Sequence, residues 1–437
     1  MSAFKPASIA ESPNVTPKKS AMVFMMLAPS AFVVYSCMYG FRKPYTVGTY
    51  GELQFLGISY KVCLVIAQVF GYMISKFYGI RFISAIKPTS RAKYILLFIG
   101  IAWLSLLLFA VIPAPYNLIC MFINGLPLGM VFGLVFGFLE GRRTTEIMGA
   151  FLATSFIFAS GLAKTVGKWL LLQFDLSEWW MPFAAGALFV VPLLIAVSFL
   201  KQAPAPTADD IAHRTARQPM TKAERKAFIK TFGRALAPII IAYAVFTIVR
   251  DFCEDFANEL WIETGYQNNA GIFTQTSTIV ALVVLILAGS FFLIRNNFKA
   301  FKATHYLIVA GVVLSAVATL LFNLQLLTPV QWMVLATTGL YLAYLPFNCI
   351  YFERMLATFQ IRANVGFVMY IADAFGYLGT VLVLLIKEFY AIEYSWVSFF
   401  SFLFYGAAAI GVLLVFLSLG MHQKLFNAFK THNNGTA

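Results

Sequence analysis

Two long stretches of this chain contain no charged residue and no histidine, and they constrain the fold more than any other feature. Residues 94–139 are 46 such residues in a row, and residues 306–352 are 47. A helix needs about 20 apolar residues to cross a bilayer, so each stretch can cross twice. The sequence Pro113-Ala114-Pro115 predicts a turn within the first stretch. Because 60% of all residues are hydrophobic and only 11% are charged, a water-soluble fold is excluded and lipid is the main solvent.

Shorter uncharged windows predict eight further membrane-spanning helices and bring the total to twelve. These windows are residues 21–41, 62–75, 147–163, 179–200, 235–249, 264–294, 363–386 and 394–421. The window 62–75 is short, so we expect its helix to continue past Lys61 and Lys76. The fold class is therefore an all-α integral membrane protein.

The two halves of the chain repeat the same plan. Each long uncharged stretch ends at a glutamate, and these residues, Glu140 and Glu353, are 213 positions apart. Two six-helix bundles in parallel orientation are typical of facilitator-type transporters, whose halves rock about a site near the midplane. The predicted units are an N-terminal tail, a first bundle, a linker, a second bundle and a C-terminal tail, at residues 1–20, 21–200, 201–234, 235–421 and 422–437.

The distribution of cations predicts the orientation. If both termini are cytoplasmic, 24 of the 32 Lys and Arg residues fall in inner tails and loops, as the positive-inside rule requires. This explains the net charge of +14 without a nucleic-acid partner, although the basic loops should attract anionic lipid. We expect a multi-pass protein of the cell (inner) membrane whose first span is retained rather than cleaved as a signal peptide. The five cysteines form no disulfide or metal-binding pattern, and we expect no cofactor and no metal.

Ionisable residues within spans are the first functional candidates, because a charge in the bilayer is costly. Arg250 lies near the middle of a helix expected to run from Arg234 to Trp261, and Arg42 closes the first span. They are 208 residues apart, each in the first helix of its half, so they would face one another across a central cavity. Two alternatives stay open: Arg250 could simply pair with Glu254 within its helix, and Arg42 could lie at the membrane edge.

Three further features admit two interpretations each. Asp373 is the only charged residue near the centre of its span. It could be a proton-coupling site or the counter-ion of a nearby cation, and we favour the counter-ion. The acidic run from Asp251 to Glu263 is read as a solvated outer face rather than a gate that pairs with Lys164 and Lys168. A stripe of glycines at intervals of four predicts close helix packing rather than a ligand-lining role; it comprises Gly125, Gly129, Gly133 and Gly137.

The segment Tyr35-Ser36-Cys37-Met38-Tyr39-Gly40-Phe41-Arg42-Lys43 resembles the first-helix motif of organophosphate:phosphate antiporters of the major facilitator superfamily. That family has tyrosines three and seven residues before an Arg-Lys pair. The resemblance implies that Arg42 and Arg250 bind a phosphoryl group and that Lys76 approaches the same site. The chain departs from the family at Thr247, where a tyrosine is expected, and at Phe158, in place of a histidine.

We therefore expect a carrier of a small anionic solute, a phosphorylated metabolite exchanged for phosphate, that acts as a monomer. Arg42 and Arg250 would clamp the anion, and the supporting donors would be Lys76, Tyr35, Tyr39 and Lys43. The alternatives are a proton-coupled symporter of an uncharged solute centred on Asp373 and a non-transporting receptor on the same fold. An enzyme is not expected, because three of the four histidines fall in inner loops or tails, His422 among them, and only His305 borders a span.

Overall fold

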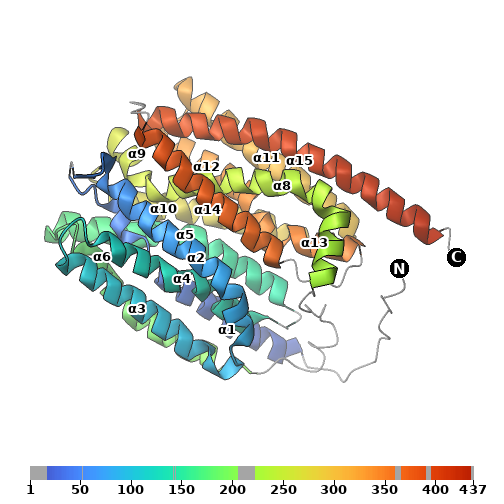
Figure 1. The fold of residues 1–437 in the computed structure, drawn as a ribbon, viewed down its shortest axis with the longest axis horizontal. Helices are drawn as coiled ribbons and strands as arrows, with labels where there is room; N and C mark the ends of the chain where they lie inside the picture. The colour runs from blue at the N-terminus through green and yellow to red at the C-terminus, as the bar shows by residue number, and fades with distance from the viewer. Residues whose placement is uncertain are drawn as a thin grey trace.

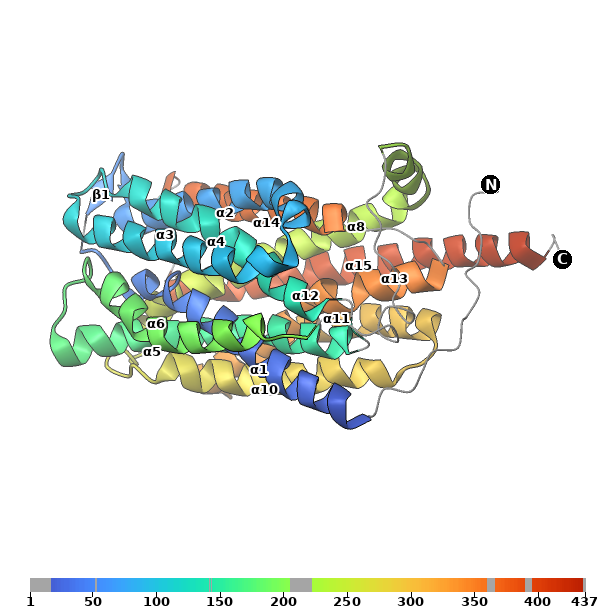
Figure 2. The same cartoon turned by 90° about the horizontal axis from the view of Figure 1, so that it is seen from below.

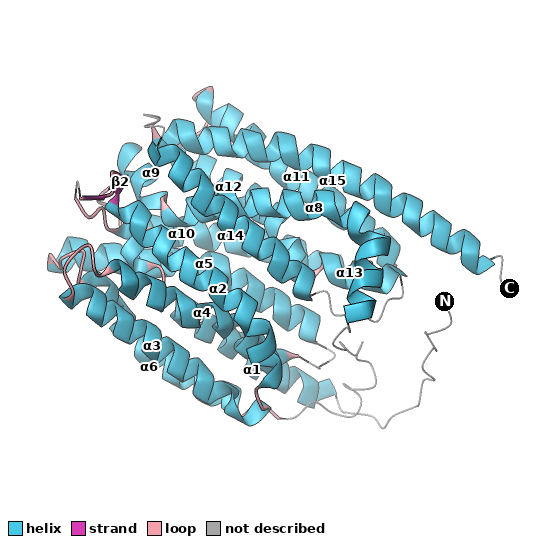
Figure 3. Cartoon of the chain, in the orientation of Figure 1, coloured by secondary structure: helices cyan, strands magenta, loops and turns pink. Residues whose placement is uncertain are grey.

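The computed structural model describes residues 17–51, 53–140, 142, 144–204, 222–359, 366–389 and 395–434. Most of the predicted N-terminal tail and residues 205–221 of the predicted linker lie outside these ranges. The described chain is almost entirely helical, apart from a two-stranded antiparallel hairpin of β1 (Gln54–Phe55) and β2 (Ile58–Ser59) (Figure 3).

The first half contains six long helices. They are α1 (Pro17–Gly40), α2 (Tyr60–Ala85), α3 (Arg91–Val111), α4 (Leu118–Leu139), α5 (Thr145–Phe174) and α6 (Met181–Lys201), with short 3-10 turns η1 (Pro44–Val47) and η2 (Pro88–Ser90). Within this half α2 and α3 pack on α4, and α1 packs on α5 and α6. The first uncharged stretch thus forms α3 and α4 with a turn at the predicted Pro113-Ala114-Pro115, so both expectations are confirmed.

The second half contains six long helices and two short ones. They are α8 (Lys222–Asp255), α9 (Ala257–Glu263), α10 (Ile272–Ser290), α11 (Asn297–Asn323), α12 (Pro329–Cys349), α13 (Tyr351–Phe359), α14 (Gly366–Phe389) and α15 (Trp396–Asn434), with a 3-10 turn η3 (Phe291–Leu293). Here α11 packs on α12 and α15, and α8 packs on α14 and α15. α13 continues α12 after a bend of 47°.

The two halves lie side by side, and contacts between their helices join them (Figure 1). α5 packs on α10, and α2 packs on α14. The start of α1 and the end of α15 lie toward one end of the molecule, whereas the β1–β2 hairpin lies at the other end (Figure 2).

Among the described residues, nine helices are long and apolar enough to cross a membrane, or ten if α12 and α13 form one bent span. An integral, multi-pass membrane protein is thereby supported. Several helices are longer than their uncharged windows, because a charge ends a window without ending a helix. α5 continues through Lys164 and Lys168, and α2 continues past Lys61 and Lys76 as expected.

Glycines let α2 and α4 approach closely. A side chain at Gly125 would collide with the backbone carbonyl of Gln68, and one at Gly129 would meet Ser75 at 2.7 Å. Small residues allow such backbone approach in membranes, where packing rather than hydrophobic burial drives association. Gly133 lies on the same helix, and Gly137 packs on the side chain of Arg91. The geometry at these positions supports the packing interpretation.

Candidate functional site

Charged side chains are buried where the two halves meet. Taking a charge out of water is costly unless it is paired, so each buried charge calls for a partner or a function. The buried charged residues of the described chain, apart from histidines, are Arg42, Lys43, Lys61, Lys164, Arg250, Asp251, Glu254, Asp255 and Asp373. Most come from α5, α8, α14 and the turn after α1, which the contacts between the halves bring together.

Arg42 has an aromatic partner but no carboxylate. Its guanidinium carbon lies 3.9 Å from the centroid of the Tyr72 ring and 5.7 Å from that of Tyr39. Its Nε has no hydrogen-bond partner, and none of the described carboxylates lies within ion-pair distance. The residue is only 5% exposed. The positive charge of Arg42 is therefore stabilised by π electrons and is free to meet an anion.

Arg250 already has partners of both kinds. Its Nη2 lies 2.5 Å from Oδ1 of Asp251, and its Nη1 donates a hydrogen bond of 2.5 Å to the hydroxyl of Tyr344. Asp251 also accepts a hydrogen bond from the Thr380 hydroxyl at 2.9 Å. The alternative pairing of Arg250 with Glu254 is wrong, because Glu254 faces Lys43 at 3.5 Å.

Two tyrosines connect the arginines. The Tyr72 ring on α2 meets the Tyr377 ring on α14 edge to face, with centroids 5.4 Å apart. Tyr377 in turn lies 6.0 Å from the guanidinium carbon of Arg250. Arg42 and Arg250 are thus brought into one cluster through an aromatic pair. Sequence reasoning missed both rings, although Tyr72 precedes Lys76 by one helical turn and Tyr377 follows Asp373 by one.

Lys76 and Asp373 form an ion pair across the same interface. The Lys76 ammonium lies 3.3 Å from Oδ2 of Asp373 and 5.4 Å from the centroid of Tyr72. Oδ1 of Asp373 accepts a hydrogen bond of 2.5 Å from the Tyr243 hydroxyl. Tyr243 also stacks on Tyr344, with ring centroids 5.1 Å apart. This geometry supports the counter-ion interpretation of Asp373, with Lys76 as the cation.

Lys43 lies in a contact between the halves. Its ammonium pairs with Asp255 and lies 3.5 Å from Glu254, both at the end of α8. Because two carboxylates already pair with Lys43, its ammonium is less available than the Arg42 guanidinium to bind an anion.

A second pair, Lys61 with Glu259, lies in the same contact. We call these five residues, Lys43, Lys61, Glu254, Asp255 and Glu259, the inter-half contact. The Lys168 ammonium adds a hydrogen bond of 3.2 Å to Asn258.

The acidic run is mostly buried rather than solvated. Asp251, Glu254 and Asp255 are at most 5% exposed, so the expected solvated outer face is wrong for these three residues. The alternative of a gate is closer to the structure, but its main cations are Lys43 and Lys61 rather than Lys164 and Lys168. Uncharged windows predict where helices lie but not which helices touch, so the sequence did not indicate this role for Lys43.

The two predicted tyrosines of α1 lie in an aromatic cluster beside Arg42. Tyr35 packs on Phe156, with ring centroids 5.0 Å apart, and on Tyr39 at 5.6 Å. Tyr39 is the second ring under the Arg42 guanidinium. Both tyrosines are buried. The Tyr39 ring is thus placed to support Arg42, and the Tyr35 ring packs against Tyr39.

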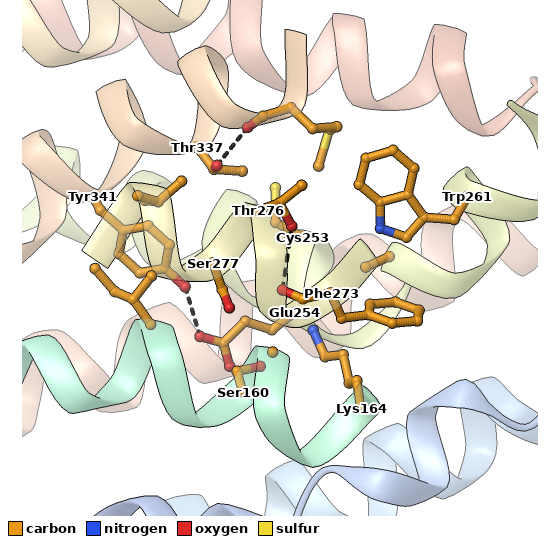
Figure 4. Close-up of a pocket in the computed structure, with 15 residues that line it drawn as sticks. Ser160, Lys164, Cys253, Glu254, Trp261, Phe273, Thr276, Ser277, Thr337 and Tyr341 are labelled. Atoms are coloured by element: carbon orange, nitrogen blue, oxygen red, sulfur yellow. Dashed lines mark hydrogen bonds between the residues drawn. The ribbon is translucent and has the colours of Figure 1, made fainter. Parts of the chain in front are cut away.

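A small cavity lies on the inter-half interface, beside the inter-half contact (Figure 4). Its volume is about 60 Å³, and α5, α8, α9, α10 and α12 line it. Figure 4 shows the Lys164 side chain pointing into the cavity, with Ser160 and Glu254 nearby and the rings of Tyr341 and Trp261 on two sides. The Tyr341 hydroxyl donates a hydrogen bond of 2.8 Å to Oε1 of Glu254. Sequence reasoning did not identify this cavity.

The histidines differ from their predicted positions. His422 is completely buried in α15 rather than exposed in a tail, and its ring centroid lies 6.0 Å from that of His305 on α11. The helix continues through the predicted boundary at residue 421. The apolar window ended there because His422 and Lys424 interrupt it, whereas the helix does not end.

The fold resembles that of transporters of known structure. It is similar to the crystal structure of a D-xylose-proton symporter, with a TM-score of 0.59 and 14% identity over 91% of this chain and 97% of that chain. It is also similar to the crystal structure of the human organic anion transporter MFSD10 (TETRAN), with a TM-score of 0.54 and 13% identity over 93% and 100% of the two chains. The chain has the fold of major facilitator transporters.

The family follows from the sequence itself. Residues 44–424 match a family described as a family of unknown function (DUF5690), and the chain belongs to that family. No curated protein matches the sequence. The resemblance to organophosphate:phosphate antiporters stays a prediction.

Proposed function

We propose that this protein is a secondary transporter of a small organic anion, with Arg42 as the main anion-binding group. The observation that carries the proposal is the buried guanidinium of Arg42, stacked on Tyr72 and without a carboxylate among the described residues. A guanidinium presents a planar fork of donors that can hold a carboxylate or phosphate bidentately. An anion that binds there would remove the cost of an unpaired buried charge.

The charges around Arg42 favour an anion over a neutral solute. Three cations face two carboxylates in the cluster around Arg42: Arg42, Lys76 and Arg250 against Asp251 and Asp373. The surplus of one positive charge supports binding of a negatively charged ligand. Arg250 and Lys76 would each shift part of their bonding from Asp251 and Asp373 to the bound anion. The paired-arginine clamp of the sequence prediction thus becomes an asymmetric site in this proposal, with Arg42 free and Arg250 shared.

Transport would proceed by alternating access of two six-helix bundles with twelve spans. The twelve longest helices, of 19 to 39 residues, would be these spans, including α2 and α14. The positive-inside rule would put both termini in the cytoplasm and the inter-half contact on the outer side of the inner membrane. The described conformation would then be closed to the outside. Opening would require Lys43 and Lys61 to release their carboxylates.

Exchange is the mode that we propose. If the empty carrier holds an unpaired Arg42, its halves would reorient slowly until an anion neutralises it, and this couples outward to inward movement. A phosphorylated metabolite exchanged for phosphate, carried by a monomer, is the form that the first-helix resemblance suggests. A proton symporter centred on Asp373 is less well supported, because Lys76 and Tyr243 already hold that carboxylate.

The test combines binding with transport. Purified protein would be screened by thermal shift against inorganic phosphate, glycerol phosphates, sugar phosphates and dicarboxylates. The best ligand would then be followed in proteoliposomes that contain the same anion inside. We expect Arg42→Gln to lose both responses and Arg295→Gln, at an exposed arginine, to keep both. A response to neutral sugars alone would refute the anion proposal, and binding without uptake would indicate a receptor.

A further inference from the structure

We propose that the cavity beside the inter-half contact is a second anion site, in which Lys164 and Ser160 bind one small anion. The ligand class is a halide or a carboxylate of one or two carbons. This site is distinct from the one around Arg42.

The two donors lie on one face of α5. Lys164 follows Ser160 by four residues, so both side chains point into the same space. Lys164 is 5% exposed and Ser160 is 3% exposed. The buried hydroxyl of Ser160 has no hydrogen-bond partner in the described chain, and no described carboxylate lies within ion-pair distance of Lys164. A buried ammonium and a buried hydroxyl without acceptors are both costly, and a bound anion would satisfy them together.

The other polar groups of the cavity cannot replace such an anion. Oε1 of Glu254 accepts from Tyr341, and Oε2 lies 3.5 Å from the Lys43 ammonium, so both oxygens are engaged away from Lys164. The hydroxyls of Thr276 and Ser277 donate to backbone carbonyls of their own helix. Of the hydroxyl and ammonium groups that line the cavity, those of Lys164 and Ser160 are the donors left over.

The size of the cavity restricts the ligand. One buried water needs about 10–15 Å³ of cavity volume. A cavity of about 60 Å³ therefore holds roughly four to six water-sized groups. Chloride, formate or acetate fits this space, whereas a sugar phosphate does not. The anion could be a free ion from the medium or the terminal carboxylate of a carried solute, and the experiment separates these sources.

The position of the cavity gives the anion a role. Glu254 follows Arg250 by one helical turn and also holds Lys43 in the inter-half contact. An anion on Lys164 would lie between the central cluster and this contact. It would compete with Glu254 for positive charge, so its occupancy would alter how firmly the contact stays closed.

The test measures thermal unfolding of the full chain in detergent at constant ionic strength, set with sodium gluconate, whose anion is too large for the cavity. The probes are sodium chloride, sodium acetate and glycerol phosphate, the last of which is too large for the cavity. The variants are Lys164→Met and Ser160→Ala, with Lys93→Met as a charge-matched control on the exposed surface of α3. Arg42→Gln reports separately on the central site.

We expect chloride or acetate to raise the unfolding midpoint in a saturable way in the native protein and in Lys93→Met. Lys164→Met should abolish this response, and Ser160→Ala should weaken the apparent affinity about tenfold, as for one lost hydrogen bond to a charged group. Arg42→Gln should keep it. A response to both probes identifies a free ion, whereas a response to acetate alone identifies a carboxylate of the solute.

Two results would overturn the second site. One is a saturable response that Lys164→Met and Ser160→Ala leave unchanged, and the other is no saturable response to either small anion. If Lys164→Met does not fold, Ser160→Ala removes only a hydroxyl and still decides the question. The glycerol phosphate response judges the central site independently, because this anion is too large for the cavity and its response should vanish in Arg42→Gln and persist in Ser160→Ala.

Discussion

Tyr72 of α2 and Tyr377 of α14 meet edge to face across the interface between the halves, with ring centroids 5.4 Å apart. Each ring lies next to an arginine of its own half: Arg42 at 3.9 Å from Tyr72 and Arg250 at 6.0 Å from Tyr377. Aromatic faces attract guanidinium groups, and edge-to-face pairs are favourable contacts of their own. The cluster therefore brings two positive charges close together in an apolar setting before any ligand arrives.

The first prediction concerns the support of Arg42. Replacing Tyr72 by Leu removes the π face under the buried guanidinium, which should cost about 1–2 kcal/mol of stability in the protein without ligand. Tyr72→Phe keeps the face and should unfold nearly as the native protein does. Thermal unfolding of the two variants in detergent provides the measurement. Equal losses in both would assign the role to the hydroxyl instead of the ring.

The second prediction concerns the inter-half contact. Lys43→Met leaves Glu254 and Asp255 without their buried cation, and such a loss typically costs about 3–5 kcal/mol. The halves should separate at this end, and the buried thiol of Cys253, one residue before Glu254, should become accessible. Labelling by a membrane-impermeant maleimide should be faster in Lys43→Met than in the native protein. Cys253→Ser in both backgrounds identifies the labelled residue, and an unchanged rate would argue against a gate.

The third prediction distinguishes two roles of Asp373. If it is the counter-ion of Lys76, Asp373→Asn should destabilise the protein by removing the carboxylate charge that lies 3.3 Å from the mostly buried ammonium, and the added change Lys76→Met should restore much of that stability. Transport by the double variant should keep the pH profile of the native protein. Loss of dependence on a proton gradient in Asp373→Asn alone would instead support proton coupling there.

The fourth prediction tests the glycine packing of α4. Gly125→Ala puts a methyl group into the backbone of α2, which cannot move aside without separating the helices, so we expect a clearly lower unfolding midpoint. The matched control is Gly100→Ala on α3, where nothing lies within 4 Å of the added carbon. That variant should be neutral or slightly more stable, by up to about 1 kcal/mol. Similar behaviour of the two variants would remove the packing role.

The helices could be predicted from the sequence because the bilayer demands one simple property, a long apolar segment. The turn at Pro113-Ala114-Pro115 and the extension of α2 past Lys61 followed from the same reasoning. Helix ends were harder to predict, because Lys164, Lys168 and His422 interrupt apolar windows without interrupting helices. A buried lysine paired across an interface reads in the sequence like a lysine at the membrane edge.

The site was harder to predict than the helices. Arg42, Arg250, Lys76 and Asp373 were chosen because charge is costly in lipid, and that argument holds for one residue at a time. Their partners come from other helices: Asp373 for Lys76 lies 297 positions away, and Tyr344 for Arg250 lies 94 away. Without knowledge of which helices touch, the sequence does not separate the free cation Arg42 from the paired cation Lys43.

The last prediction concerns the shape of the Arg250 side chain. Its guanidinium donates to both Asp251 and the hydroxyl of Tyr344. The guanidinium carbon lies 4.5 Å from the centroid of the Tyr344 ring. Arg250→Lys keeps the charge but loses the planar fork, so it can satisfy only one of these partners well. We expect normal insertion into the membrane and loss of at least nine tenths of uptake in proteoliposomes. The reason is that the planar guanidinium can keep a hydrogen bond to Asp251 while it donates another to the anion, which a lysine cannot do. Near-normal uptake by Arg250→Lys, measured beside Arg295→Lys as a surface control, would show that charge alone suffices and would reduce the proposed site to Arg42 and its tyrosines.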